Sequence, residues 1–123
     1  MNLKIVSPIL GFDGLKEVTK SEIDDFFSTL EHEGISFTLI SPTKVRSYDI
    51  EIPASYESLL EVEEGDKLEV YNIVIVQDPI EKSFVNFAAP IIINTNKNLL
   101  VQVALDSAKY PQFGVSESIS DYL

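Results

Sequence analysis

The side chains best suited to chemistry in this sequence are carboxylates that gather between Glu57 and Glu69. Six acidic residues face one base, Lys67, in this run. Clustered carboxylates could bind calcium, but an EF-hand loop requires ligands at alternating positions, a glycine at the sixth position and a glutamate at the twelfth. The segment EVEEGDKLE does not follow that spacing, and its Gly65-Asp66 pair predicts a turn. We therefore interpret the run as a solvated, charged connection.

Other groups that could carry catalysis are few. Cysteine is absent and His32 is the only histidine, so the sequence offers neither a thiol nucleophile nor a histidine-rich metal site. The adjacent Asp24 and Asp25 would point in different directions on a helix, and no glycine-rich phosphate loop occurs. We expect no catalytic residue, no metal and no cofactor. A hydrolase whose two carboxylates meet only in the folded chain stays open as an alternative.

The sequence is strongly acidic, with a formal net charge of −11 from 20 acidic and 9 basic residues. Such a surface repels phosphate backbones, which argues against direct binding of DNA or RNA, and it attracts basic proteins. No apolar run approaches the roughly 20 residues of a membrane span, and the N-terminus MNLKIVSPILGF lacks the apolar core of a signal peptide. We expect a cytoplasmic protein that does not contact membranes; its oligomeric state stays open, with a monomer favoured.

The elements that must position these groups are mainly strands. Apolar periodicity predicts a helix over 21–33, with His32 in its last turn, and a helical turn from Pro53 through Leu60. Strands are predicted at 3–6, 36–41, 48–52, 68–77, 83–94 and 99–105. We expect one domain over 1–123, mainly β, with a small barrel-like fold of about seven short strands and one or two short helices. Residues 111–123 are expected to form a flexible or helical tail.

The two most apolar segments carry more specific expectations. LEVYNIVIVQ, residues 68–77, is apolar on both faces, which predicts a central strand covered on both sides. In SFVNFAAPIIINTNKN, Pro90 indicates an edge or a bulge, because proline cannot donate to a ladder. A hairpin between this segment and 99–105, with odd-numbered core positions on both strands, requires an odd number of loop residues, and the three residues 96–98 satisfy this. Thr95 would then lie opposite Leu99, and Asn98 would adopt the left-handed conformation.

Four motifs, SPILGF, YDIEIP, VNFAAPIIIN and VQVALDSAKYP, follow one another along the chain. In this order they resemble the flagellar assembly factor family FliW, from Pro8 to Pro111. The most specific part is the segment 85–94, which is similar to the family's VN-x-x-AP-hydrophobic-x-IN signature. The sequence departs from the family pattern at Phe87 and Ala88, where aliphatic residues are commoner, and in the tail.

The resemblance implies a barrel-like regulator and not an enzyme. FliW proteins bind flagellin in the bacterial cytoplasm and also bind the translational repressor CsrA, so that flagellin synthesis follows flagellin export. An acidic antagonist suits a repressor that needs basic surface to bind RNA. The candidate partner-binding residues are Asp78, Glu81, Asn86, Glu61, Glu63, Glu64 and Asp66.

Two questions stay open from the sequence. Asn86 could tie a neighbouring loop to the sheet, as buried amides commonly do, or it could face a partner protein. A small-ligand carrier that uses a barrel cavity is the other alternative function.

Overall fold

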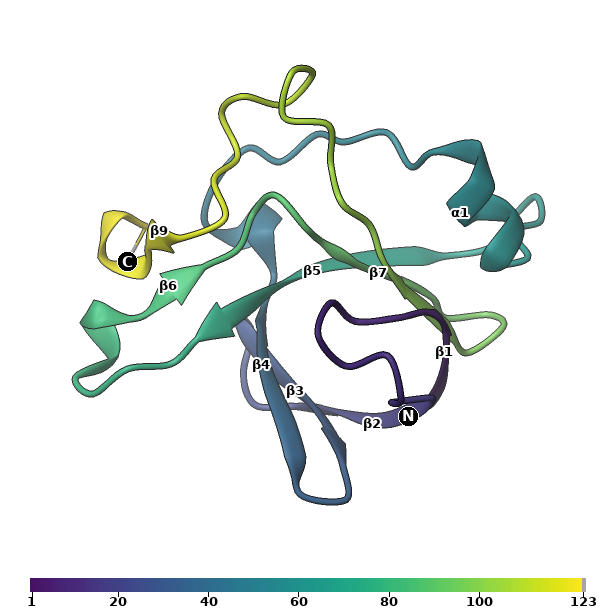
Figure 1. Ribbon diagram of the computed structural model, residues 1–123, viewed down its shortest axis with the longest axis horizontal. Coiled ribbons are helices and arrows are strands. Elements are labelled where there is room, and N and C mark those ends of the chain that lie inside the picture. The colour runs from purple at the N-terminus through teal and green to yellow at the C-terminus, as the bar shows by residue number, and fades with distance from the viewer. Residues whose placement is uncertain (123) are drawn as a thin grey trace.

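The computed structural model describes residues 1–122 and consists mainly of strands (Figure 1). The strands are β1 (Asn2–Ser7), β2 (Glu17–Glu22), β3 (Phe27–His32), β4 (Ile35–Ile40), β5 (Leu68–Ile75), β6 (Phe84–Val85), β7 (Ile91–Asn94), β8 (Leu99–Gln102) and β9 (Glu117–Ser118). The helical elements are α1 (Ala54–Leu59) and the 3₁₀ turns η1 (Pro42–Lys44), η2 (Ile80–Lys82) and η3 (Ile119–Asp121).

Seven of these strands close into a barrel. Their order is β4-β3-β2-β1-β8-β7-β5, and a further pairing of β4 with β5 completes the ring. The β1–β8 pair is parallel, whereas the other ladders are antiparallel. Strands β6 and β9 extend the sheet outward from β5. The predicted mainly β barrel of about seven short strands is confirmed, and in the described part of the chain it carries one short α-helix.

The barrel interior is filled by apolar side chains. Leu30 and Leu39 are fully buried there beside Ile91 and Ile93 from β7. The segment after β1 folds across the ring, where Figure 1 shows it in purple. Its residue Ile9 is buried in the same apolar cluster. A packed interior of this kind leaves little room for a ligand inside the barrel.

One amide fastens the segment after β1 in place. The side chain of Gln102, on β8, accepts a hydrogen bond from the Leu10 backbone N–H at 2.7 Å. It also donates to the Ala89 carbonyl at 3.1 Å. Because Gln102 is buried, both ends of its amide are satisfied inside the protein.

A second core lies outside the barrel and attaches the irregular segments. Phe87 is fully buried and its ring packs against Tyr48 and Tyr122, with centroids 5.9 and 5.2 Å away. The Arg46 guanidinium lies 4.9 Å from the Phe87 centroid and pairs with Glu117 at 3.2 Å. Burial raises the pKa of Tyr48 to about 12, so its neutral hydroxyl donates to the Phe87 carbonyl.

The prediction of a helix over 21–33 is wrong, because this segment contains the end of β2, the hairpin turn and β3. The Asp24 carboxylate accepts hydrogen bonds from the backbone N–H groups of Phe26 and Phe27, which makes a turn where the helix was expected. Ile23 and Phe26 are exposed, while Ser28 and Leu30 are buried with the two-residue period of a strand.

The predicted position of His32 changes with that hairpin. His32 ends β3, and Glu33 and Gly34 form the two-residue turn to β4 with φ of 45° and 87°. Such turns require positive φ at both positions, which Gly34 adopts freely. The glycine that was expected to end a helix therefore closes a hairpin.

The strand predicted at 48–52 is also absent, although the predicted facing is correct. Tyr48 is buried and Asp49 and Glu51 are exposed, but the segment joins no ladder. Side chains anchor it, since the hydroxyl of Tyr110 accepts a hydrogen bond from the Glu51 N–H at 2.8 Å.

The β7–β8 hairpin has a register different from the predicted one. Asn94, not Thr95, lies opposite Leu99, so the loop has four residues. The predicted register placed only the odd-numbered residues of each strand in the core, yet all four residues of β7, which point to both faces, are buried. Asn98 has φ of 56°, as predicted. The segment 83–94 is not one continuous strand. It is interrupted between β6 and β7, and Pro90 lies in the interruption.

The end of the chain pairs with the sheet. Residues 117 and 118 form β9 against β6, and the 3₁₀ turn η3 follows, while residue 123 lies outside the described residues. Ile119 is fully buried in the second core, which explains why the segment is anchored there.

Candidate functional site

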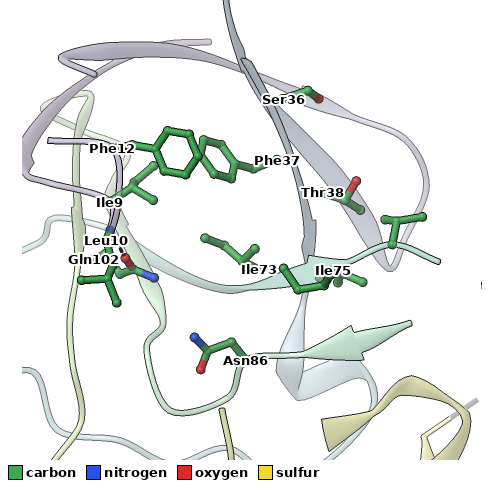
Figure 2. A pocket seen from close by; sticks show the side chains of 12 residues that line it. Ile9, Leu10, Phe12, Ser36, Phe37, Thr38, Ile73, Ile75, Asn86 and Gln102 are labelled. Carbon is green, nitrogen blue, oxygen red and sulfur yellow. Dashed lines mark hydrogen bonds between the residues drawn. The ribbon is translucent and has the colours of Figure 1, made fainter. Parts of the chain in front are cut away.

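An apolar groove opens where β4 and β5 separate. Its volume is about 520 Å³. Figure 2 shows side chains from the segment after β1, from β4 and from β5 around this hollow, with Phe12 and Phe37 in contact. Their ring centroids are 4.9 Å apart in an edge-to-face arrangement. The apolar side chains that line the groove include Leu10, Phe12, Phe37, Ile73, Ile75 and Val76.

Three of these side chains are unusually exposed for apolar residues. Leu10 is 81% exposed, Ile75 54% and Val76 51%. Apolar side chains gathered around a hollow and left in water are typical of a protein-docking or ligand-binding site. The groove is the strongest candidate binding surface of the described residues.

Asn86 lies at the edge of this groove (Figure 2). Its backbone N–H donates to the Ile73 carbonyl at 3.0 Å, which fixes its position against β5. Its side-chain oxygen accepts a hydrogen bond from the Ala88 N–H at 3.1 Å. Within residues 1–122 the side-chain nitrogen has no hydrogen-bond partner, so two N–H donors remain for a bound molecule.

Asp78 and Glu81 follow β5 in the connection to β6, and both are exposed. Asp78 lies two residues after Val76 of the groove, and Glu81 belongs to η2. Their role as rim charges for a basic partner stays a prediction.

The acidic run after α1 divides into one structural carboxylate and several exposed ones. Asp66 accepts hydrogen bonds from the Asn94 side chain and the Lys97 ammonium, both at 2.9 Å, and from the Glu63 N–H at 3.0 Å. These bonds tie the connection to the β7–β8 hairpin. Glu61 and Glu64 are exposed, and Glu63 is exposed apart from a 3.4 Å ion pair with Lys97.

The hydrogen bonds of Asp66 make stability depend on pH. The bonds from Asn94, Lys97 and the Glu63 backbone favour the charged carboxylate and lower its pKa from 3.8 to about 2. Because the folded-state pKa is depressed, its contribution is complete above about pH 4 and is lost as pH falls toward about 2. We expect Asp66→Asn to unfold at lower urea concentration than the parent protein at pH 7, with the difference shrinking from pH 4 to pH 2. A difference that stays constant over this range would contradict the assignment.

The groove was not predicted from the sequence. Residues 68–77 were expected to be covered on both faces, yet the strand ends at Ile75 and the last apolar residues are exposed. The available signal was the motif SPILGF, in which two large apolar residues flank a glycine with positive φ, Gly11. Apolar residues in such a turn cannot all reach the core.

No metal site or membrane helix emerges from the described residues. Over 1–122, no group of three or more His, Cys, Asp or Glu side chains is placed to hold a metal ion. None of the helices in that range has the length and apolar character needed to cross a membrane.

Comparison with known proteins gives the family. A family model described as FliW protein matches residues 2–113. The chain belongs to the FliW family of flagellar assembly factors. The match covers the four motifs that carried the resemblance, including the segment 85–94, which spans β6 and β7.

Curated FliW relatives align along nearly the whole chain. The flagellar assembly factor FliW of Sulfurimonas denitrificans is 46% identical over 100% of this chain and 98% of its own length. FliW of Campylobacter lari is 41% identical over 100% and 97%, and FliW 2 of Wolinella succinogenes is 40% identical over 99% and 92%. A crystal structure of the flagellar assembly factor FliW, 24% identical, matches the fold with a TM-score of 0.84 over 96% of this chain and 84% of that one.

Proposed function

We propose that this protein binds flagellin and the translational repressor CsrA in the bacterial cytoplasm, and that it couples flagellin synthesis to flagellin export without catalysing a reaction. The observation that carries the proposal is family membership along almost the full chain, at 46% identity to a FliW relative. Free protein would hold CsrA away from flagellin messenger RNA, and bound flagellin would release it.

Two surfaces of different chemistry support a protein with two partners. Among residues 1–122, no charged side chain lines the groove beside β4 and β5, whereas Glu61 and Glu64 on the connection after α1 are exposed carboxylates. An RNA-binding repressor carries basic surface, so exposed carboxylates on a protein of charge −11 would attract it and speed the encounter.

The alternatives receive less support. A carrier with a ligand inside the barrel conflicts with the filled interior, where Leu30, Leu39 and Ile91 are fully buried. A hydrolase would need two converging carboxylates, and Asp24 and Asp25 lie exposed in the turn between β2 and β3. The partner-switch function therefore explains more of the molecule than either alternative.

The test is direct binding of the purified protein to flagellin and to CsrA, measured separately by biolayer interferometry at 50 and 500 mM NaCl. We expect both to bind, and we expect the association rate with CsrA to fall by about tenfold or more at the higher salt concentration because screening weakens steering. Absence of binding to either partner would overturn the proposal. An unchanged CsrA association rate would overturn the electrostatic part of it.

A further inference from the structure

We propose that the groove binds an extended, uncharged apolar segment of flagellin, which adds a short strand between the separated ends of β4 and β5. This inference rests on the proposed function, because it takes flagellin binding as given and assigns the surface and the binding mode. Peptides that add a strand to a sheet gain affinity from backbone hydrogen bonds and specificity from pockets for alternate side chains.

The backbone pattern of β4 shows which groups are available. Ser41 donates to the Phe26 carbonyl on the β3 side, so the odd-numbered residues of β4 direct their backbone polar groups toward β3. The even-numbered residues, including Ser36 and Thr38, must then direct theirs toward β5.

The backbone polar groups of β5 alternate between its two neighbouring strands in the same way. Asn86 donates to the Ile73 carbonyl and Gln77 donates to the Ser83 hydroxyl, both on the β6 side. The even-numbered residues of β5 and Val76 beyond it therefore direct their backbone groups toward β4.

Pairing between the two strands stops before these groups are used. The last pair is Thr38 with Val74, and the same register would place Ser36 opposite Val76. Neither residue pairs across the gap, and within residues 1–122 no hydrogen bond joins them. Two N–H donors and two carbonyl acceptors thus face the groove from opposite sides, which is the arrangement that an inserted strand requires.

The groove lining specifies an apolar and uncharged occupant. Its apolar side chains, Leu10 and Ile75 among them, are left in water, and none of its lining residues is charged. The free amide donors of Asn86 would meet a backbone carbonyl of the bound segment. A charged segment would lose its hydration in this groove without a counter-ion.

Charge complementarity assigns this occupant to flagellin and not to CsrA. A subunit that polymerises into a filament must carry apolar self-association surface, and that surface is unburied before assembly. The basic surface of an RNA-binding repressor instead matches the carboxylates of Glu61 and Glu64, which do not line the groove.

A pair of matched variants tests the groove. Leu10→Glu places a carboxylate in the groove. Ile23→Glu places one in the β2–β3 turn, at another exposed apolar position. The side chain of Leu10 is 81% exposed and that of Ile23 is 60% exposed. We expect Leu10→Glu to weaken flagellin binding by about tenfold or more, with CsrA binding and thermal unfolding unchanged, and Ile23→Glu to bind both partners like the parent protein. Equal flagellin binding by the parent and Leu10→Glu would overturn the groove assignment.

Hydrogen exchange of individual amides tests the inserted strand. In the parent protein with saturating flagellin, the amides of Ser36 and Val76 should exchange at least tenfold more slowly than in the free protein, whereas the Gln77 amide, already bonded to Ser83, should change little. Weakened binding by Leu10→Glu without slower exchange at Ser36 and Val76 would overturn strand addition. Failure of the parent protein to bind flagellin at all would instead refute the proposed function.

Discussion

Replacing Phe87 with alanine is expected to lower the free energy of unfolding by about 3–5 kcal/mol, the usual cost of deleting a fully buried aromatic side chain. Phe87 is 0% exposed, and its ring packs against Tyr48, Tyr122 and the Arg46 guanidinium. Its removal would leave a cavity beneath the segments that close the second core. Guanidinium unfolding followed by circular dichroism measures the effect.

Phe84→Ala is the matched control for this prediction. Phe84 lies on β6 three residues earlier and is 40% exposed, so its truncation should cost about 1 kcal/mol or less. If Phe87→Ala does not fold, Phe87→Leu, which deletes less volume, should give an intermediate loss. A loss for Phe87→Ala no larger than that for Phe84→Ala would mean that the second core does not hold the fold together.

Replacing two exposed glutamates after α1 with lysines is expected to slow association with CsrA by about tenfold at low salt. The reason is that electrostatic steering of the encounter scales with the charge near the contact. The variant is Glu61→Lys combined with Glu64→Lys, which leaves the structural Asp66 and its ion pair with Lys97 intact. Stopped-flow or interferometry measures the association rate, and flagellin binding should not change.

The control for this prediction is a second double variant that has the same net charge as the first. Asp25→Lys combined with Glu31→Lys reverses two exposed acidic side chains, one in the β2–β3 turn and one on β3, and neither belongs to the acidic run. We expect this control to slow CsrA association by no more than about threefold, through net charge alone. Equal effects of the two double variants would show that the acidic run is not a specific contact surface.

The barrel could be predicted because its strands carry their own signal. Residues 36–41 and 68–77 are apolar with strand periodicity and lie within one or two residues of β4 and β5. The helix over 21–33 failed because Ile23, Phe26 and Leu30 fit a helical spacing by coincidence. Asp24 turns the chain between Ile23 and Phe26, so those two side chains face solvent and not a common core.

The candidate site could be predicted only in part. The acidic run is visible in the sequence, but the structural role of Asp66 comes from hydrogen bonds with Asn94 and Lys97, which lie 28 and 31 residues away. The groove arises because the pairing of β4 with β5 stops at Thr38 and Val74. Such a separation of strands leaves no local pattern, since Ile75 and Val76 continue the apolar run as if they were buried.

Displacement of CsrA by flagellin tests the central claim most directly. A complex of this protein with fluorescently labelled CsrA would be titrated with purified flagellin, and the bound fraction of CsrA would be followed by fluorescence anisotropy. A switch between partners requires that binding of one weaken binding of the other, so we predict that saturating flagellin releases CsrA, and that Leu10→Glu shifts release to higher flagellin concentration. Retention of CsrA at saturating flagellin, with both partners bound to the parent protein, would contradict the account.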